Sequence, residues 1–354
     1  MRNGSWKTRS SRNASLAPPP APPLVSFMRF RLLFFLPLFV TACPAAPAVT
    51  AKKEGSQVVF RAGDREMFRY QAEPGALPRP DIKETFTRGG YLYPLLTPSG
   101  KPVGDDYPPK HIHHHGVWWA WTKTEFEDRK PDFWNMGDKK GRVEFVALDG
   151  VWEKDGAAGL KARHQFVDLL ASPPKTALLE TWEIRAAADD SGKTPRYLID
   201  FTTTQTCAGP SPLKLPKYHY GGIGFRGHRS WDGAVPCEFL TSEGITDRLK
   251  GNESHAKWLW TGGPVEGVTV GLTILCHPSN YRFPQALRLN PTEPFVCFAP
   301  QQDGEMEIKP GTPYVSRYRL ILSDGKPTIE QGNAWWQEYA AAAPAPVPPA
   351  EKKP

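Results

Sequence analysis

The strongest constraint on the fold is an alternation of apolar and polar residues with a period of two, which recurs along most of the chain. The alternation is plain at 197–204 and 315–322, where it predicts half-buried β-strands. The 31 glycines and 38 prolines punctuate these runs as turns. Strands are predicted at 57–61, 66–71, 143–148, 161–169, 177–185, 196–204, 257–261, 268–276, 295–299 and 314–322. So many strands in one chain predict an all-β fold, a large antiparallel β-sandwich.

One C-terminal segment has a helical pattern instead. Pro327 stands just before the first turn of a helix predicted at 328–343, and Trp335, Trp336 and Tyr339 form its apolar patch. We find no internal repeat and no change of composition between residues 55 and 340, which predicts a single domain over 55–340. Residues 44–54 are predicted to be a linker, and the Ala/Pro/Lys-rich residues 341–354 a disordered tail.

The net charge of +7 invites a nucleic-acid hypothesis, but its distribution argues against one. Residues 1–43 hold six basic residues and no acidic one, which leaves 38 basic against 37 acidic residues in the remainder. A body so close to neutral gives no electrostatic reason to expect a polyanionic partner. We therefore expect no nucleic acid.

The basic N-terminal segment has the organisation of an export leader. Arg29 and Arg31 precede an apolar run at 32–40, and Val40-Thr41-Ala42-Cys43 resembles the lipobox of bacterial lipoproteins, in which the cysteine is lipidated. The run is too short to span a bilayer. Residues 1–43 thus predict an exported, periplasmic or cell-envelope lipoprotein whose membrane contact is a lipid anchor at Cys43. The alternative to a lipoprotein signal is a plain secretory signal cleaved within 45–48. Because residues 1–27 precede the basic region, Met28 is also a candidate for the true start.

Export would permit disulfides among the four later cysteines. Cys207, Cys237, Cys276 and Cys297 allow three pairings, but none has Cys-x-x-Cys spacing and two lie in apolar runs. We expect buried free thiols, with disulfide pairing as the alternative.

Residues 110–121 carry the densest chemistry, with four of the nine histidines and three of the twelve tryptophans. If the segment is extended, His111, His113 and His115 share one face and His114 faces away. Such imidazoles suit acid/base catalysis, metal ligation or structural hydrogen bonds. Alternation also predicts that Trp119 and Trp121 face one side of the sheet and Trp118 the other.

Other segments offer groups for a sugar site. Trp134 is a candidate exposed stacking platform beside Asn135, and the glycines of 218–226 permit close backbone approach near His219. Arg226 suits a carboxylate or polyhydroxyl group, and His277 and Asn280 stand at a strand end, where loops often carry function. A carboxylate partner for a histidine is left open among Glu180, Glu183 and Asp132.

Several of these segments together resemble a known family. They are Tyr91-Leu-Tyr-Pro-Leu-Leu-Thr-Pro-Ser-Gly, the histidine block, Asp132-Phe-Trp-Asn, Tyr220-Gly-Gly-Ile-Gly-Phe-Arg, His277-Pro-Ser-Asn, Pro310-Gly-x-x-Tyr-x-x-Arg-Tyr-Arg and Asp324-Gly. In this order they resemble the bacterial PmoA-like proteins, labelled "methane oxygenase PmoA", over residues 58–326. The resemblance implies a galactose-mutarotase-like β-supersandwich of the aldose-epimerase type.

The family pattern in the histidine block is close to Asp-His-Pro-His-His-Arg-Gly, which corresponds to residues 110–116. His111, His113 and His114 match the pattern, whereas Lys110 and His115 replace its Asp and Arg. His115 can take over a donor or cationic task, but it cannot reproduce a bidentate guanidinium.

We therefore predict a carbohydrate-active protein acting on a sugar or polyol, with His113 or His114 as acid/base and His111 beside them. The predicted substrate-binding residues are Trp134, Asn135, His219, Arg226, His277 and Asn280. The alternatives are a non-catalytic sugar-binding lipoprotein and a metal-dependent oxygenase with a divalent metal on His111, His113 and His219. The sequence itself requires no cofactor.

Overall fold

The computed structural model describes residues 17–21, 46–192, 194–233 and 236–342. Cys43, most of the leader and the tail from residue 343 lie outside the described residues. The described residues from 46 onward form one compact unit. In the described part of the chain, no helix combines the length and apolar character needed to cross a membrane.

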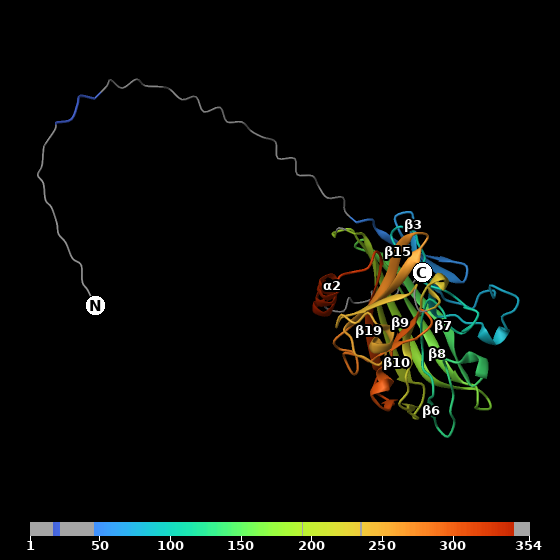
Figure 1. Ribbon diagram of the computed structural model, residues 1–354. Coiled ribbons are helices and arrows are strands. Elements are labelled where there is room, and N and C mark those ends of the chain that lie inside the picture. The colour runs from blue at the N-terminus through green and yellow to red at the C-terminus, as the bar shows by residue number, and fades with distance from the viewer. Residues whose placement is uncertain (1–16, 22–45, 193, 234–235, 343–354) are drawn as a thin grey trace, which may run out of the picture. The chain divides into compact units, whose positions relative to one another are not determined.

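Two large antiparallel sheets make up the domain (Figure 1). The first has eight strands in the order β1-β2-β3-β4-β5-β12-β17-β16. Their bounds are β1 Val49–Glu54, β2 Gln57–Ala62, β3 Arg65–Gln71, β4 Tyr91–Leu95, β5 Val117–Ala120, β12 Gly222–Arg226, β16 Leu287–Leu289 and β17 Phe295–Phe298.

The second sheet has eight longer strands in the order β13-β14-β15-β19-β10-β9-β8-β7. Their bounds are β7 Gly141–Lys154, β8 Ala157–Asp168, β9 Lys175–Asp189, β10 Arg196–Cys207, β13 Glu238–Thr241, β14 Trp258–Val265, β15 Val268–Cys276 and β19 Tyr314–Asp324. A small third sheet joins β18 Met306–Ile308, β11 Leu213–Leu215 and β6 Glu125–Phe126. Short 3-10 helices occupy Glu84–Phe86, Met136–Asp138, Arg229–Trp231 and Pro300–Asp303.

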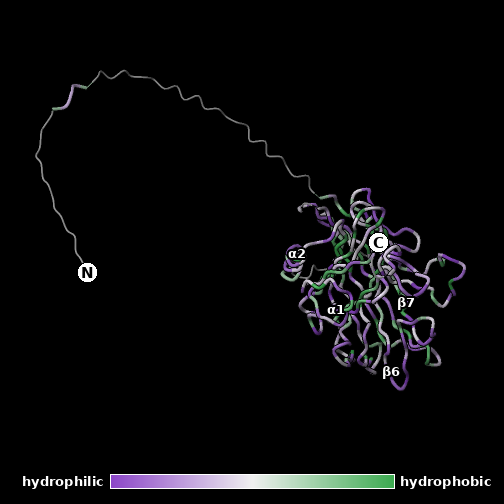
Figure 2. The backbone as a smooth tube through the Cα atoms, viewed as in Figure 1, coloured by the Kyte–Doolittle hydropathy of each residue, from purple (hydrophilic) through white to green (hydrophobic). Residues whose placement is uncertain are grey.

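One hydrophobic core lies between the two large sheets and takes side chains from both. Trp119 of the first sheet, for example, packs on Phe201 and Tyr318 of the second. The hydropathy colouring shows the same arrangement, with apolar stretches inside and polar loops around them (Figure 2). The period of two in the sequence thus arises because every second side chain of a strand points into this core.

The C-terminal helix α2, Ile329–Ala341, covers the other face of the second sheet. Thr328 caps it, because its hydroxyl accepts from Gln331 N while the Gln331 side chain accepts from Thr328 N. Tyr339 packs with Trp258 and Trp260 in a second, smaller core. A one-turn helix, α1 Arg248–Gly251, lies between β13 and β14.

The predicted all-β sandwich with one C-terminal helix is confirmed, and each predicted strand segment lies wholly or largely within a strand. The predicted linker at 44–54 is wrong at its C-terminal end, because Val49–Glu54 pairs with β2 and buries Val49 and Ala51. The expected free thiols are present: Cys237, Cys276 and Cys297 are buried and unpaired, and Cys207 is a half-buried free thiol.

Candidate functional site

A pocket opens on the face of the first sheet that points away from the second. Across this sheet, Arg288, Cys297, Gly224 and Trp118 are successive register partners, so their side chains share one face. The neighbouring row of Leu287, Phe298, Ile223 and Trp119 points into the core. This confirms that Trp118 faces away from Trp119 and Trp121.

The pocket, which we call the histidine pocket, has a volume of about 320 Å³. Such a volume suits a small ligand. It is lined by His111, His113, His114, Trp134, Asn135, Tyr218, His219, Tyr220, Arg288, Asn290 and Phe295.

The histidine block folds as two successive turns rather than as a strand. His111 N donates to Pro108 O at 3.1 Å, and His114 N donates to His111 O at 2.8 Å. Pro109 suits the second position of the first turn, where a fixed φ is favourable. The turns bring the rings of His111 and His114 into a parallel stack with centroids 4.8 Å apart. The expectation that alternation separates these two histidines is therefore wrong.

His111 is the histidine that combines access with a carboxylate neighbour. Its side chain is 36% exposed, and its Nδ1 lies 2.7 Å from Oε2 of Glu293, whose side chain is 6% exposed. The ring is turned so that its Nδ1 makes no hydrogen bond with this oxygen. Arg226 forms an ion pair with the same carboxylate, and its Nη1 lies 2.5 Å from Glu293 Oε2.

His113 and His114 are kept neutral by their surroundings. Burial, together with the neighbouring His111 and His115, lowers the pKa of His113 from 6.5 to about 3. Burial lowers the pKa of His114 well below its usual value, and its ring stacks on Trp118 and Phe295. At neutral pH these two imidazoles can donate or accept hydrogen bonds, but neither has a proton to release as a cationic acid.

Trp134 and Asn135 are held in the wall by a buried carboxylate. Asp132 Oδ1 accepts from the backbone N of both residues, at 3.0 and 2.9 Å, and Oδ2 accepts from Asn135 Nδ2 at 2.9 Å. Trp134 is only 1% exposed, so it lines the pocket without being the exposed platform that the sequence suggested. Gly224 makes room for it, since a Cβ there would lie 3.0 Å from the Trp134 ring.

Tyr218, His219 and Tyr220 form an aromatic wall just before β12. Gly222 follows with a φ of +90°, and a Cβ there would lie 2.8 Å from Phe298 O. Its close approach is therefore to the neighbouring strand. Burial raises the pKa of Tyr220 to about 12, so its hydroxyl stays protonated. Burial and the charge of Arg288 lower the pKa of His219.

Four residues proposed from the sequence do not line this pocket. Arg226 is fully buried and pairs with Glu293 and Asp232, each at 2.5 Å, so it binds carboxylates of its own chain. His277 packs against Tyr339 of α2, and Asn280 joins the end of β15 to Arg317 of β19. His115 is buried, with Nδ1 2.6 Å from Asp106 Oδ1, and burial lowers its pKa.

The sequence also left the carboxylate partner of a histidine undecided among three residues, and none of the three pairs with a histidine of the pocket. Glu180 lies 3.4 Å from the buried His164, Glu183 pairs with Lys161, and Asp132 holds the Trp134 turn. The partner is Glu293, in the loop between β16 and β17. Arg288, Asn290 and Phe295 come from the same region, and the only local signal for them is the Asn-Pro-Thr-Glu-Pro turn.

A metal site requires donors that converge on one point. The set that comes closest in the described residues is His111, His114 and Glu293, whose donor atoms lie within 4.8 Å of one another, rather than His111, His113 and His219. Two features oppose an ion there. Parallel stacked rings do not direct in-plane lone pairs at a common point, and Arg226 already neutralises the carboxylate. The donor set fits a metal poorly.

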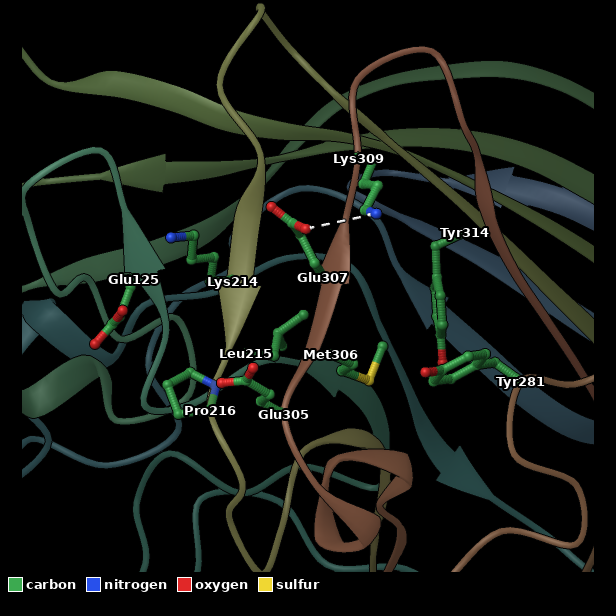
Figure 3. Close-up of a pocket in the computed structure, with 10 residues that line it drawn as sticks. All are labelled: Glu125, Lys214, Leu215, Pro216, Tyr281, Glu305, Met306, Glu307, Lys309 and Tyr314. Carbon is green, nitrogen blue, oxygen red and sulfur yellow. Dashed lines mark ion pairs between the residues drawn. The ribbon is translucent and has the colours of Figure 1, made fainter.

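A larger cavity of about 750 Å³ lies at the small third sheet (Figure 3). Its walls carry Glu125, Lys214, Glu305, Glu307 and Lys309, beside Tyr281 and Tyr314. Glu307 and Lys309 pair with each other at 3.9 Å, and the lining holds no histidine. The histidine pocket is therefore the better candidate for chemistry.

A family model described as a family of unknown function, DUF6807, matches residues 57–337. The chain belongs to this family. All residues of the histidine pocket fall within the DUF6807 match. No curated protein matches the chain.

Two solved structures are similar to this chain. A galactose mutarotase related enzyme from Lactobacillus acidophilus is 7% identical with a TM-score of 0.33, covering 79% of this chain and 98% of that one. The heparan sulfate lyase HepC from Pedobacter heparinus is 11% identical with a TM-score of 0.32, covering 79% of this chain. The match spans only 37% of the lyase.

Proposed function

We propose that this DUF6807 protein is a carbohydrate-active enzyme that performs acid/base chemistry on a sugar or sugar derivative in the histidine pocket. The observation that carries the proposal is the 2.7 Å approach of His111, a partly exposed residue that lines the pocket, to the buried Glu293 behind it. A carboxylate beside one ring nitrogen can hold an imidazole in one orientation, which leaves the other ring nitrogen free to exchange a proton as a general acid/base.

The lining of the pocket supports a sugar as the ligand. The half-buried Tyr220 supplies an aromatic face for the C–H face of a sugar ring, and the buried Trp134 packs against Tyr220. Asn135, Asn290 and the protonated hydroxyl of Tyr220 supply donors and acceptors for its hydroxyl groups. This mixture of flat apolar faces and planar polar groups is typical of sites that bind small polyhydroxylated molecules.

The roles follow from the contacts. Glu293, itself held by Arg226, orients His111 through Nδ1, which leaves Nε2 as the atom that exchanges a proton with the substrate. His113 and His114 remain neutral and contribute hydrogen bonds. This assignment moves the acid/base role from His113 or His114, which the sequence favoured, to His111.

The experiment is a product screen by NMR over sugars and their keto and unsaturated derivatives, with wild type and His111→Asn. We expect His111→Asn to lower turnover of any accepted substrate about 100-fold or more while binding persists. Glu293→Gln should lower kcat with a smaller effect on KM. His255→Asn is the matched control, because His255 also pairs with a carboxylate, Asp303 at 3.0 Å, but lies outside the pocket.

Equal turnover by wild type and His111→Asn would remove His111 from catalysis. Saturable sugar binding with no product from the wild type would instead indicate a non-catalytic sugar-binding protein.

We also propose that the protein is an exported lipoprotein anchored through Cys43 and a PmoA-like protein. The lipobox-like Val40-Thr41-Ala42-Cys43 supports the first part and the ordered motif set from Tyr91 to Gly325 the second. Labelling with a radioactive fatty acid tests the anchor: the label should enter the wild type and be absent from Cys43→Ala. Equal labelling of both would refute it.

A further inference from the structure

Arg288 is the one lysine, arginine, aspartate or glutamate among the described residues that line the histidine pocket. It lies on β16 between the buried Leu287 and Leu289, so its side chain points to the opposite face. Asn290, two residues later, lines the same pocket. The strand thus directs a guanidinium into a site that contains no lining carboxylate.

In the described part of the chain, no carboxylate lies within ion-pair distance of Arg288. Its Nη1 donates to Asn252 Oδ1 at 3.1 Å, and the same oxygen accepts from Leu289 N at 3.1 Å. The amide therefore positions the guanidinium without neutralising it. A guanidinium has five donors and stays protonated in proteins, so most of its donors remain available to a ligand.

The surroundings do not cancel this charge. Glu293, the carboxylate beside His111, is already paired with Arg226 at 2.5 Å. Lys123 Nζ lies 5.8 Å from the centre of the Tyr218 ring, which adds a second cation beside the wall. The carboxylate of Glu253, next to Asn252 in the chain, forms no ion pair with Arg288.

We infer that the pocket takes an anionic sugar, a uronate or other sugar acid, and that Arg288 binds its carboxylate. The inference rests on the proposed function and names its substrate class. Carboxylate and guanidinium are both planar, and two parallel N–H···O bonds fix orientation as well as charge. A ligand held in this way presents its ring to His111 in one orientation.

The test uses matched pairs of glycosides that differ only at C6, which is a carboxylate in one member and a hydroxymethyl group in the other. Methyl β-D-glucuronide is compared with methyl β-D-glucoside, and methyl α-D-galacturonide with methyl α-D-galactoside, by NMR titration of the full chain at low salt. We expect the better uronide to bind at least tenfold more tightly than its neutral partner. That preference should weaken as salt rises, because the charges are only half buried.

Arg288→Gln should abolish the preference, so that each uronide binds no more tightly than its neutral partner, whereas Arg288→Lys should retain part of it. Arg163→Gln removes the same charge from an exposed pair with Asp149 on the second sheet, and should behave as wild type. Thermal unfolding checks that each variant is folded. If Arg288→Gln does not fold, Arg288→Lys still tests the preference for uronides.

Neutral glycosides that bind as well as the uronides would overturn the anionic-sugar inference and leave the proposed function standing. The same holds if Arg288→Gln and Arg288→Lys both keep the full preference. If none of the four glycosides binds, both the inference and the proposed sugar site fail.

Discussion

Burial keeps His113 and His114 neutral, and the same burial makes the fold sensitive to acid. In the unfolded chain His113 titrates near 6.5, whereas in the folded protein burial holds its pKa at about 3. Between these values the unfolded chain binds the extra proton and the folded protein does not, so stability falls as pH falls through this window. Acid therefore destabilises the histidine pocket well before the carboxylates titrate.

From pH 7 to pH 5, His113 alone should account for about 2 kcal/mol of lost stability, the free energy of protonating an ordinary histidine in the unfolded chain. Urea unfolding at the two pH values measures the loss. In His113→Gln the decrease between the two pH values should be smaller by about that amount, whatever the absolute stability of the variant. A decrease of equal size in both proteins would show that His113 titrates normally in the fold.

Arg226 illustrates how a buried charge depends on its partners. Its side chain is fully buried between Glu293 and Asp232. Arg226→Gln would leave Glu293 buried without its cation, which should lower the free energy of unfolding by about 3–5 kcal/mol. Arg226→Gln combined with Glu293→Gln should be more stable than Arg226→Gln alone, as urea unfolding would show. A double variant no more stable than the single one would indicate that Arg226 acts through packing rather than through this ion pair.

The sequence located part of the pocket because its histidines, Trp134 and Asn135 lie in dense local motifs. It did not locate Glu293 or Arg288, which come from strands and a loop far along the chain. Pairing across β5, β12, β17 and β16 brings these residues to the site. Alternation tells which face a side chain takes within its own strand, but it does not tell which strand is the neighbour.

At the scale of elements, the long strands were predictable, whereas most strands of two to five residues were not, β17 excepted. Strands β9 and β10 alternate over many residues because one face packs in the core. Strand β5, Val117–Ala120, is buried at every position, so it carries no alternation to detect. The histidine turns were missed because residues 110–121 were treated as one extended segment. The turn that Pro108 and Pro109 begin continues to His114, and the strand starts only at Val117.

Helix α2 depends on a glycine where helix propensity alone would favour alanine. A Cβ on Gly332 would lie 2.3 Å from the ring of Trp258, so the helix could not keep its place on the second sheet. Gly332→Ala should therefore lower the Tm despite a gain of about 1 kcal/mol in propensity. Ala334→Gly, at an exposed position of the same helix, should lose about 1 kcal/mol from propensity alone. A raised Tm for Gly332→Ala would show that α2 does not pack against Trp258.

At the scale of the whole molecule, the sandwich begins earlier than the family match. The match starts at residue 57, but β1 is the edge strand of the first sheet. It also reaches the second sheet, since Ala51 N donates to Glu153 Oε1 at 3.1 Å and Val49 N to Gly156 O at 2.9 Å. Strand β1 therefore ties the edges of the two sheets together.

A chain shortened to start at Gln57 should consequently be less stable than one that starts at Ala45. Removing β1 exposes the core around the buried Val49 and Ala51 and leaves β2 as an unpaired edge, so we expect a loss of at least about 2 kcal/mol and a tendency to aggregate. Urea unfolding and light scattering measure the two effects. Lys52→Ala, an exposed change on the same strand, should alter neither. An edge strand that buries apolar side chains and pairs along its length cannot be removed without a loss of stability. Equal stability of the two chains would therefore mean that β1 adds nothing to the sandwich and that residues 49–54 serve as the linker that their sequence suggested.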